Sequence, residues 1–223
     1  PFKDDGRLDR VECRELFCQS VPLFISAFAS AYILNASKYS IDRLIDHQAQ
    51  VFYTVMLLPA TTVHMLAGFV YRPMLTEYAV LWNQKQLRDF VKKVHKIFAW
   101  MLAAAAGLEL VSGFVLLPFL EWMYDISGLA GYRAEFGILL LAGACNAANI
   151  FLSLILTIMR MQSKMLSAYS VTFAVSLILP DALVSMYGIS GAAVTFFLLM
   201  LLQAVLTYGI FCRGILHRQE ETC

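Results

Sequence analysis

The chain has 223 residues, a formal net charge of +1, 60% hydrophobic residues and a mean hydropathy of +0.67. Soluble domains contain about 45–50% apolar residues, so the composition excludes an ordinary soluble domain and predicts an all-α integral membrane protein. The near-neutral charge gives no support for nucleic-acid binding. The five cysteines contain no Cys-x-x-Cys pair, which argues against a disulfide framework and against a zinc site.

Six apolar stretches come close to the roughly 20 residues that a helix needs to cross a membrane. We expect the spans at about residues 15–35, 49–71, 97–118, 135–158, 165–186 and 190–211. The sequence therefore predicts one six-span transmembrane lobe over residues 15–214. Residues 1–14 would be a cytoplasmic leader or inter-lobe linker, and residues 215–223 a cytoplasmic tail.

Lysine and arginine are unevenly distributed between the segments that connect these spans. All but three of them precede the first span or follow the second, fourth and sixth; the exceptions are Lys38, Arg43 and Arg133. By the positive-inside rule, both ends of this segment are cytoplasmic and the polar octapeptide NASKYSID, residues 35–42, lies outside. We expect this octapeptide to close the first span as a short polar turn.

The segment QLRDFVKKVHKIF, which starts at Gln86, has apolar residues at helical spacing and basic residues toward another face. This pattern predicts an interfacial amphipathic helix at about residues 85–96. Two roles stay open for it. It either anchors the orientation of the protein on anionic lipid, or it grips the pyrophosphate of a lipid headgroup.

The fourth predicted span carries a polar stripe, because Asn146, Asn149, Ser153, Thr157 and Arg160 follow one another at steps of three and four residues. The same span contains AGACNAAN, a small-residue surface that lets helices approach closely. The stripe therefore either seals helix packing by hydrogen bonds or lines a water-filled cavity. Its continuation to Arg160 favours the cavity.

Glu109 lies near the middle of the third predicted span, where a charged side chain costs roughly 2.5–3.5 kcal/mol. It is either an ion-coupling carboxylate or a neutralised packing residue, and His64 is the titratable residue at similar depth. Pro22, Pro59 and Pro180 lie inside spans and predict bent helices. We find no metal cluster, no nucleophile with a base and no phosphate-binding loop, so we expect a protein that is not an enzyme and has no cofactor or metal.

Several longer motifs occur in a fixed order along the chain. They are VPLFISAFASAYILNASKYSID, FVYRPMLTEYAVLW, PFLEWMYDISGLAGYRAEF, LSLILTIMRMQSKMLSAY and YGISGAA. Together they resemble the C-terminal half of bacterial polysaccharide transporters, the O-antigen and exopolysaccharide flippases of the multidrug, oligosaccharidyl-lipid and polysaccharide exporter superfamily. The likeness covers nearly the whole chain after about residue 12.

The resemblance implies two six-helix lobes that face each other across a central cavity, with this chain as the C-terminal lobe. Because the chain begins at Pro1 rather than Met, we expect the N-terminal lobe upstream as part of the same chain. Such a protein would move a polyprenyl-diphosphate-linked oligosaccharide from the inner to the outer leaflet of the bacterial inner membrane, by alternating access. Its partners would be this lipid-linked oligosaccharide, membrane lipids and the missing lobe.

For the substrate path, the resemblance and the residue chemistry together give five candidates: Arg72, Asn146, Asn149, Ser153 and Lys38. Arg72 either binds a lipid diphosphate bidentately or snorkels to lipid phosphate. Lys38 either contacts substrate or belongs to a plain turn. Glu109 is the candidate for ion coupling.

Two other functions fit the same residues. One is a cation-coupled multidrug or metabolite exporter of the same superfamily. The other is a non-transporting membrane subunit of a polysaccharide-synthesis complex. Cavity substitutions would be silent in the subunit, whereas resistance to cationic dyes would indicate the exporter.

Overall fold

The computed structural model describes residues 10–111, 115–124 and 128–220, and the regular structure in these ranges is helical, without a strand. The all-α class predicted from the sequence is therefore confirmed. The helices in chain order are α1 (Arg10–Leu44), α2 (His47–Asn83), α3 (Leu87–Val111), α4 (Leu117–Tyr124), the 3₁₀ helix η2 (Leu129–Tyr132), α5 (Arg133–Ile158), α6 (Gln162–Ser176) and α7 (Leu179–Glu220).

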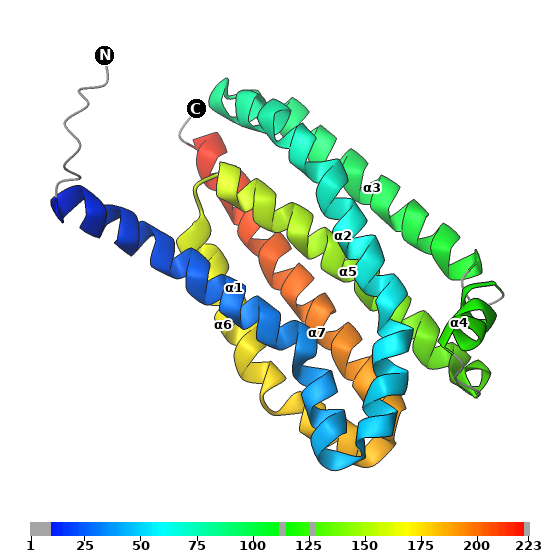
Figure 1. The fold of residues 1–223 in the computed structure, drawn as a ribbon. Coiled ribbons are helices and arrows are strands. Elements are labelled where there is room, and N and C mark those ends of the chain that lie inside the picture. Colours follow the sequence, from blue (N-terminus) through cyan, green and yellow to red (C-terminus); the bar gives the residue numbers. More distant parts are fainter. Residues whose placement is uncertain (1–9, 112–114, 125–127, 221–223) are drawn as a thin grey trace.

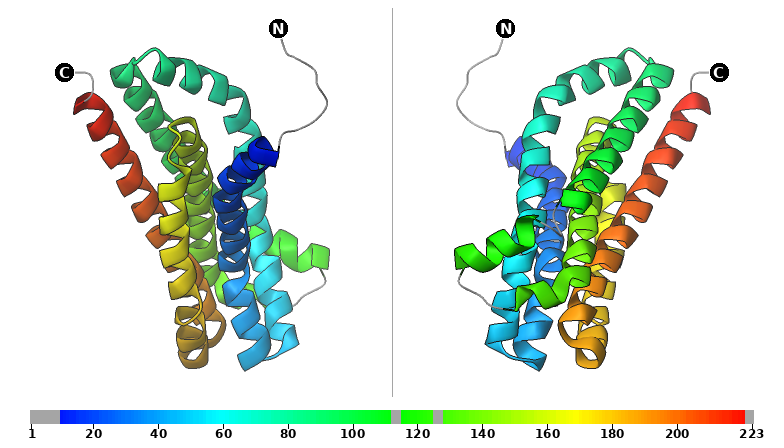
Figure 2. Two further views of the ribbon diagram at one scale, coloured as in Figure 1. Left: turned by 90° about the vertical axis from the view of Figure 1, so that its left-hand side faces the viewer. Right: turned by 90° about the vertical axis from the view of Figure 1, so that its right-hand side faces the viewer.

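The long helices form a bundle around α5, which packs against α7, α2 and α3, while α1 packs against α6 and α7 (Figure 1). The α2–α3 turn, the α5–α6 turn and the C-terminal end of α7 lie at one end of the bundle, which we call the α2–α3 end. The α1–α2 turn and the junction of α6 with α7 lie at the opposite end, the α1–α2 end. The short helix α4 lies across the direction of the long helices (Figure 2).

Two described helices are long and apolar enough to cross a membrane, Arg133–Ile158 in α5 and Leu179–Arg218 in α7. The 26 residues of the first give a length of about 39 Å at the rise of an α-helix. Six crossings were predicted from the sequence. The other four of these six crossings stay a prediction.

A close contact between α5 and α2 depends on a small residue in the AGACNAAN segment. A Cβ atom built at Gly143 would lie 2.8 Å from the Cβ of Ala60. Because real side chains do not tolerate that distance, only glycine allows this approach of the two backbones. The large buried side chains Phe136 and Phe151 lie on the same helix, before and after Gly143.

The octapeptide NASKYSID does not form a turn; residues 35–42 are the last helical turns of α1. The side-chain amide of Asn35 bonds back to the carbonyl of Ala31 at 2.8 Å. The chain turns three residues later, where Asp46 caps α2 by accepting a hydrogen bond of 2.6 Å from the N–H of Ala49. The polar residues thus show where the apolar run of α1 ends, whereas the Asp46 cap determines where α2 begins.

The two turns at the α2–α3 end share one construction, with a basic residue in the left-handed conformation. Lys85 has φ 59° and Arg160 has φ 57°. In the first turn the N–H of Gln86 donates to the carbonyl of Leu81 at 3.0 Å, and the α5–α6 turn repeats this bond between residues five apart at 2.9 Å. This arrangement is a Schellman motif, which satisfies carbonyl groups at the helix end.

The predicted amphipathic helix at about residues 85–96 corresponds to the first turns of α3, which continues without a break to Val111. Its apolar face packs on the end of α2. Phe90 and Val94 are fully buried, and the ring of Phe90 lies 5.3 Å from that of Trp82 and 6.0 Å from that of Tyr78. Phe98 in turn packs on the rings of Phe151 on α5 and Tyr208 on α7. Neighbouring helices therefore cover apolar side chains that the sequence assigned to the membrane interface.

Helix α7 contains a backbone break at Gly188, with φ 61° and ψ −133°, and is two helices in its geometry. The fifth predicted span therefore consists of α6, a turn after Ser176 and the first turns of α7 up to this break. Pro180 lies in the first turn of α7, where its missing N–H costs no hydrogen bond. The change of direction next to Pro180 is the turn between Ser176 and Leu179.

Candidate functional site

The polar stripe of α5 contains one of the most buried polar groups of the bundle. Asn149 is 3% exposed, and its side-chain amide donates to the carbonyl of Met200 on α7 at 3.1 Å. Gln203, one turn further along α7, is also 3% exposed. Together with Asn146 these amides line a small cavity of about 10 Å³, whose wall is formed by α1, α5, α6 and α7.

The stripe changes character toward the α2–α3 end. Ser153 donates to the carbonyl of Asn149 at 2.7 Å and contacts the hydroxyl of Tyr169 on α6 at 3.1 Å. Thr157 is exposed and donates to the carbonyl of Ser153 at 2.8 Å, and Arg160 is exposed in the α5–α6 turn. The hydroxyl groups are thus used for bonds within the helix and to α6. A substrate contact for Asn146, Asn149 or Ser153 stays a prediction.

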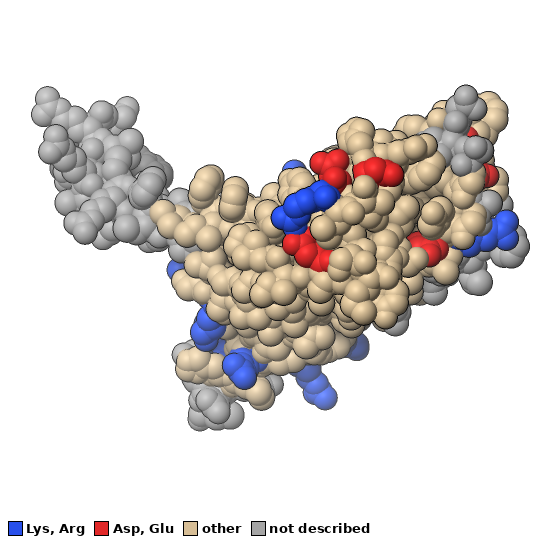
Figure 3. Space-filling model, turned by 90° about the horizontal axis from the view of Figure 1, so that it is seen from below, with Lys and Arg blue, Asp and Glu red and all other residues tan. Residues whose placement is uncertain are grey.

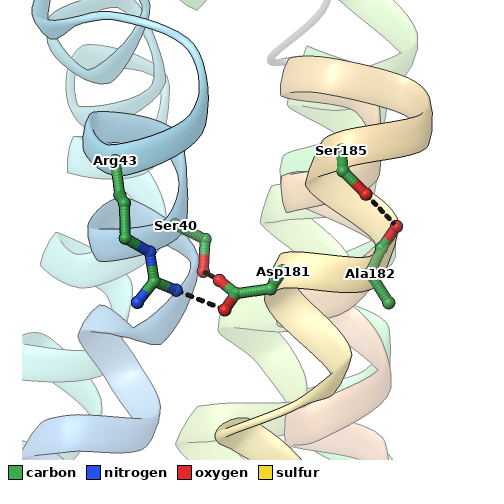
Figure 4. Close-up of polar contacts among 5 residues, drawn as sticks. All are labelled: Ser40, Arg43, Asp181, Ala182 and Ser185. Atoms are coloured by element: carbon green, nitrogen blue, oxygen red, sulfur yellow. Dashed lines mark hydrogen bonds and ion pairs between the residues drawn. The ribbon is translucent and has the colours of Figure 1, made fainter.

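At the α1–α2 end, two side chains of α1 bind one carboxylate of α7. Ser40 donates to one oxygen of Asp181 at 2.6 Å, and Arg43 forms an ion pair with the other (Figure 4). The side chains of Arg43 and Asp181 are 63% and 40% exposed, whereas Ser40 is buried. These contacts connect the end of α1 with the start of α7. No local sequence pattern predicted this connection, because its residues are 138 and 141 positions apart in the chain.

Charged side chains gather over one part of the face at the α1–α2 end, and the rest of its described surface is mostly uncharged (Figure 3). A hollow of about 560 Å³ opens beside the break in α7, with Asp46, Gln48, Tyr132 and Tyr187 in its wall. Its size falls within the range of small-molecule sites, about 300–1,000 Å³. Lys38 lies on α1 at this end and is half-buried, and burial lowers the pKa of its amine.

A second, part-buried polar contact joins α5 to α7 close to this hollow. Ser190, two residues after the break at Gly188, donates to a carboxylate oxygen of Glu135 at 2.5 Å. Glu135 lies in the first turn of α5, where a negative charge is favourable. No local pattern in the sequence pairs the two residues, because they are 55 positions apart in the chain. Their position on the same predicted outer side was the available clue.

Arg72 lies on the exposed surface of α2, which continues past it to Asn83. Eleven residues separate Arg72 from that helix end, which corresponds to about 16 Å along the axis. The same end of the bundle holds an ion pair between Glu77 and Lys93 and a contact of the Arg218 guanidinium with the Trp82 ring at 4.7 Å. The site candidates thus lie in separate places: Arg72 toward the α2–α3 end, the amides inside the bundle and Lys38 at the opposite end.

Glu109 and His64 are described by their backbone only. The backbone of Glu109 belongs to α3 and that of His64 to α2, but both side chains lie outside the described residues. The ion-coupling role of Glu109 therefore stays a prediction. Among the described residues, no group of three or more His, Cys, Asp or Glu side chains is placed to hold a metal ion.

Comparison of the chain with protein-family models, with curated proteins and with solved structures gives no match. The resemblance to polysaccharide flippases consequently rests on the ordered motifs of the sequence alone.

Proposed function

We propose that this chain is a six-span lobe of a flippase in the inner membrane of a bacterium. It acts in moving polyprenyl-diphosphate-linked oligosaccharide from the inner to the outer leaflet for polysaccharide export, by alternating access. Both ends of this segment are cytoplasmic in the proposed topology. The substrate class comes from the resemblance of five ordered motifs, and the membrane setting has further support from the structure.

The outward-facing side chains support a membrane setting. Large apolar residues are strongly exposed on different helices: Phe24 on α1 is 74% exposed, Phe69 on α2 is 73% exposed and Trp122 on α4 is 79% exposed. Soluble monomers seldom expose large contiguous apolar surfaces, whereas a bilayer solvates such side chains. Together with the two apolar helices α5 and α7, this surface is typical of a bundle surrounded by lipid.

The single observation that carries the proposal is the position of the basic segments. The α2–α3 turn, the α5–α6 turn and the end of α7 are far apart in the sequence but lie at one end of the bundle (Figure 1). Each contributes cationic side chains: Arg88, Lys92, Lys93, Lys96, Arg160, Lys164, Arg213 and Arg218. A cationic end fits the cytoplasmic side and attracts the diphosphate of a lipid-linked precursor.

Arg72 is the residue through which we test this proposal. We expect Arg72→Gln to insert into the membrane at the normal level but to lower flipping about tenfold or more, because the headgroup loses a bidentate partner. The measurement is the fraction of lipid-linked oligosaccharide exposed on the outer leaflet in cells that carry the variant.

Arg133→Gln provides the control, because Arg133 is also an exposed arginine but lies at the start of α5, at the opposite end of that helix from the cationic α5–α6 turn. Its loss should have a much smaller effect if Arg72 contacts the headgroup. Normal flipping by Arg72→Gln would remove the headgroup role of Arg72. Dye resistance conferred by the intact protein, without any change in oligosaccharide sidedness, would instead favour the drug exporter.

A further inference from the structure

The small cavity inside the bundle is surrounded by polar groups from four helices. Its wall includes Ser30 of α1, Asn146 and Asn149 of α5, Tyr169 of α6 and Gln203 of α7, and its volume is about 10 Å³. None of these side chains carries a charge at neutral pH. Asn149 and Gln203 are both more than nine-tenths buried, so their hydrogen bonds must be satisfied inside the protein or by a bound molecule.

The amide of Asn149 has a fixed orientation. Its nitrogen donates to the backbone carbonyl of Met200 at 3.1 Å, and a carbonyl can only accept. The oxygen Oδ1 is therefore the other end of the amide, and it is buried without a hydrogen-bond partner among the described residues. An amide carbonyl in this position needs a donor.

The orientation of Gln203 is fixed in a similar way by Thr207. The Thr207 hydroxyl donates its hydrogen to the backbone carbonyl of Gln203 at 2.7 Å, so its oxygen accepts from the Gln203 amide nitrogen at 3.3 Å. Oε1 of Gln203 is thus the free end, and within the described part of the chain it also has no partner.

The neighbouring hydroxyl groups do not supply the missing donors. Ser153 donates to the backbone carbonyl of Asn149 at 2.7 Å, so the Tyr169 hydroxyl is the donor in its 3.1 Å contact with Ser153. Ser30 contacts the hydroxyl of Tyr169 in turn. The hydrogens of Ser153, Tyr169 and Thr207 therefore point away from the two free amide oxygens.

We infer that the cavity binds one water molecule, which donates one hydrogen bond to Oδ1 of Asn149 and one to Oε1 of Gln203 and thereby connects α5 to α7. A water has the two donors that this pair of acceptors needs. The cavity is about the size of one water, for which roughly 10–15 Å³ is required. A bare cation is disfavoured because the described residues of the wall include no carboxylate to neutralise its charge in a low-dielectric interior. This inference does not rest on the proposed transport function.

The direct test is an experimental structure of the intact chain in lipid, at a resolution that shows buried solvent. We expect an ordered solvent peak within about 3.2 Å of both amide oxygens. A structure that shows other buried waters but no peak here would overturn the inference. A peak with several oxygen contacts near 2.4 Å would also overturn it, because such distances belong to a metal cation.

A double-mutant cycle on Asn149→Leu and Gln203→Met tests the connection in solution. Both changes replace an amide by an apolar group of similar shape. If one water serves both oxygens, each single variant raises the unfolding equilibrium constant, and the double variant should raise it about tenfold less than the product of the two single increases. Additive effects would contradict the shared water. Thr195→Val combined with Asn149→Leu is the control and should be additive, because the Thr195 hydroxyl bonds to Gly191 within α7 at 2.7 Å.

Thermal unfolding of the unchanged chain in two salts distinguishes a bound water from a bound cation. The inference predicts the same Tm in sodium chloride and in choline chloride at equal ionic strength. A sodium-specific rise in Tm that Gln203→Met abolishes would assign the cavity to a monovalent cation. Should either variant fail to fold, the experimental structure and this salt comparison still decide the question.

Discussion

Ser40, Arg43 and Asp181 show how single residues connect distant parts of this chain. The Ser40–Asp181 hydrogen bond of 2.6 Å joins residues 141 positions apart. The ion pair of Arg43 with the same carboxylate is largely solvent-exposed, so salt screens it and its contribution to stability is small. The buried hydroxyl of Ser40 is the more important of the two donors.

We therefore predict that Ser40→Ala lowers the free energy of unfolding by about 1–2 kcal/mol, because a carboxylate loses a charge-assisted hydrogen bond. Ser185→Ala is the matched control, since the Ser185 hydroxyl bonds to the carbonyl of Ala182 in its own helix at 2.9 Å (Figure 4). Chemical unfolding in detergent micelles measures both. Equal losses for the two variants would argue against a role of the α1–α7 contact.

At the residue scale, the sequence showed which polar residues lie inside the bundle but not what they contact. The steps of three and four between Asn146, Asn149 and Ser153 predicted one polar face. The partners Met200, Gln203 and Tyr169 come from α6 and α7. Which helix faces the stripe is a property of the packing, so periodicity along one helix could not reveal it.

The break in α7 is the most specific conformational feature among the helices. Gly188 has φ 61° and ψ −133°, a region in which side chains other than glycine are strained. YGISGAA indicated this position as a motif before the last span. It gave no information on the backbone angles.

We predict that Gly188→Ala lowers the free energy of unfolding by about 1–3 kcal/mol, the usual cost of such a conformation for a residue with a Cβ atom. Gly209→Ala should have the opposite sign and raise it by roughly 0.5–1 kcal/mol, because Gly209 is inside a regular helical segment and its added Cβ meets open space. Thermal unfolding of the two variants provides the comparison. A neutral Gly188→Ala would mean that α7 is continuous in solution.

The element boundaries illustrate what apolar runs can and cannot locate. The predicted fourth span at about residues 135–158 agrees closely with α5, because both its ends are marked by charged or polar residues. α1 and α2 instead continue as helices well beyond their apolar runs, to Leu44 and Asn83. Hydropathy shows which part of a helix is apolar, whereas caps and Schellman motifs determine where the helix begins and ends.

For the whole molecule, the central structural prediction is that the turns alternate between two sides of a membrane. We expect a cysteine introduced at Tyr187 to react with an impermeant thiol reagent from the outside, and one at Arg160 to react from the cytoplasmic side. Both residues are exposed; Tyr187 lies beside Asp46 of the α1–α2 turn, and Arg160 lies in the α5–α6 turn at the other end of the bundle. The five native cysteines would first be replaced. Labelling of both positions from the same side would contradict the proposed topology.

At the scale of the whole molecule, least could be predicted from the sequence. The alternation of Lys and Arg predicted that four basic segments lie on one side. Three of them, at the α2–α3 turn, the α5–α6 turn and the end of α7, lie at one end of the bundle (Figure 1), whereas the leader falls largely outside the described residues. The hollow beside the break in α7 was not predicted, because its wall combines the α1–α2 turn, η2 and α7. Such a site exists only after elements distant in sequence have come together.

The most direct measurement of the proposed function is the sidedness of lipid-linked oligosaccharide in cells that lack this gene. The flippase proposal predicts accumulation at the inner leaflet and recovery of outer-leaflet exposure when the intact protein is restored. Normal sidedness in the deletion strain, with normal surface polysaccharide, would contradict it.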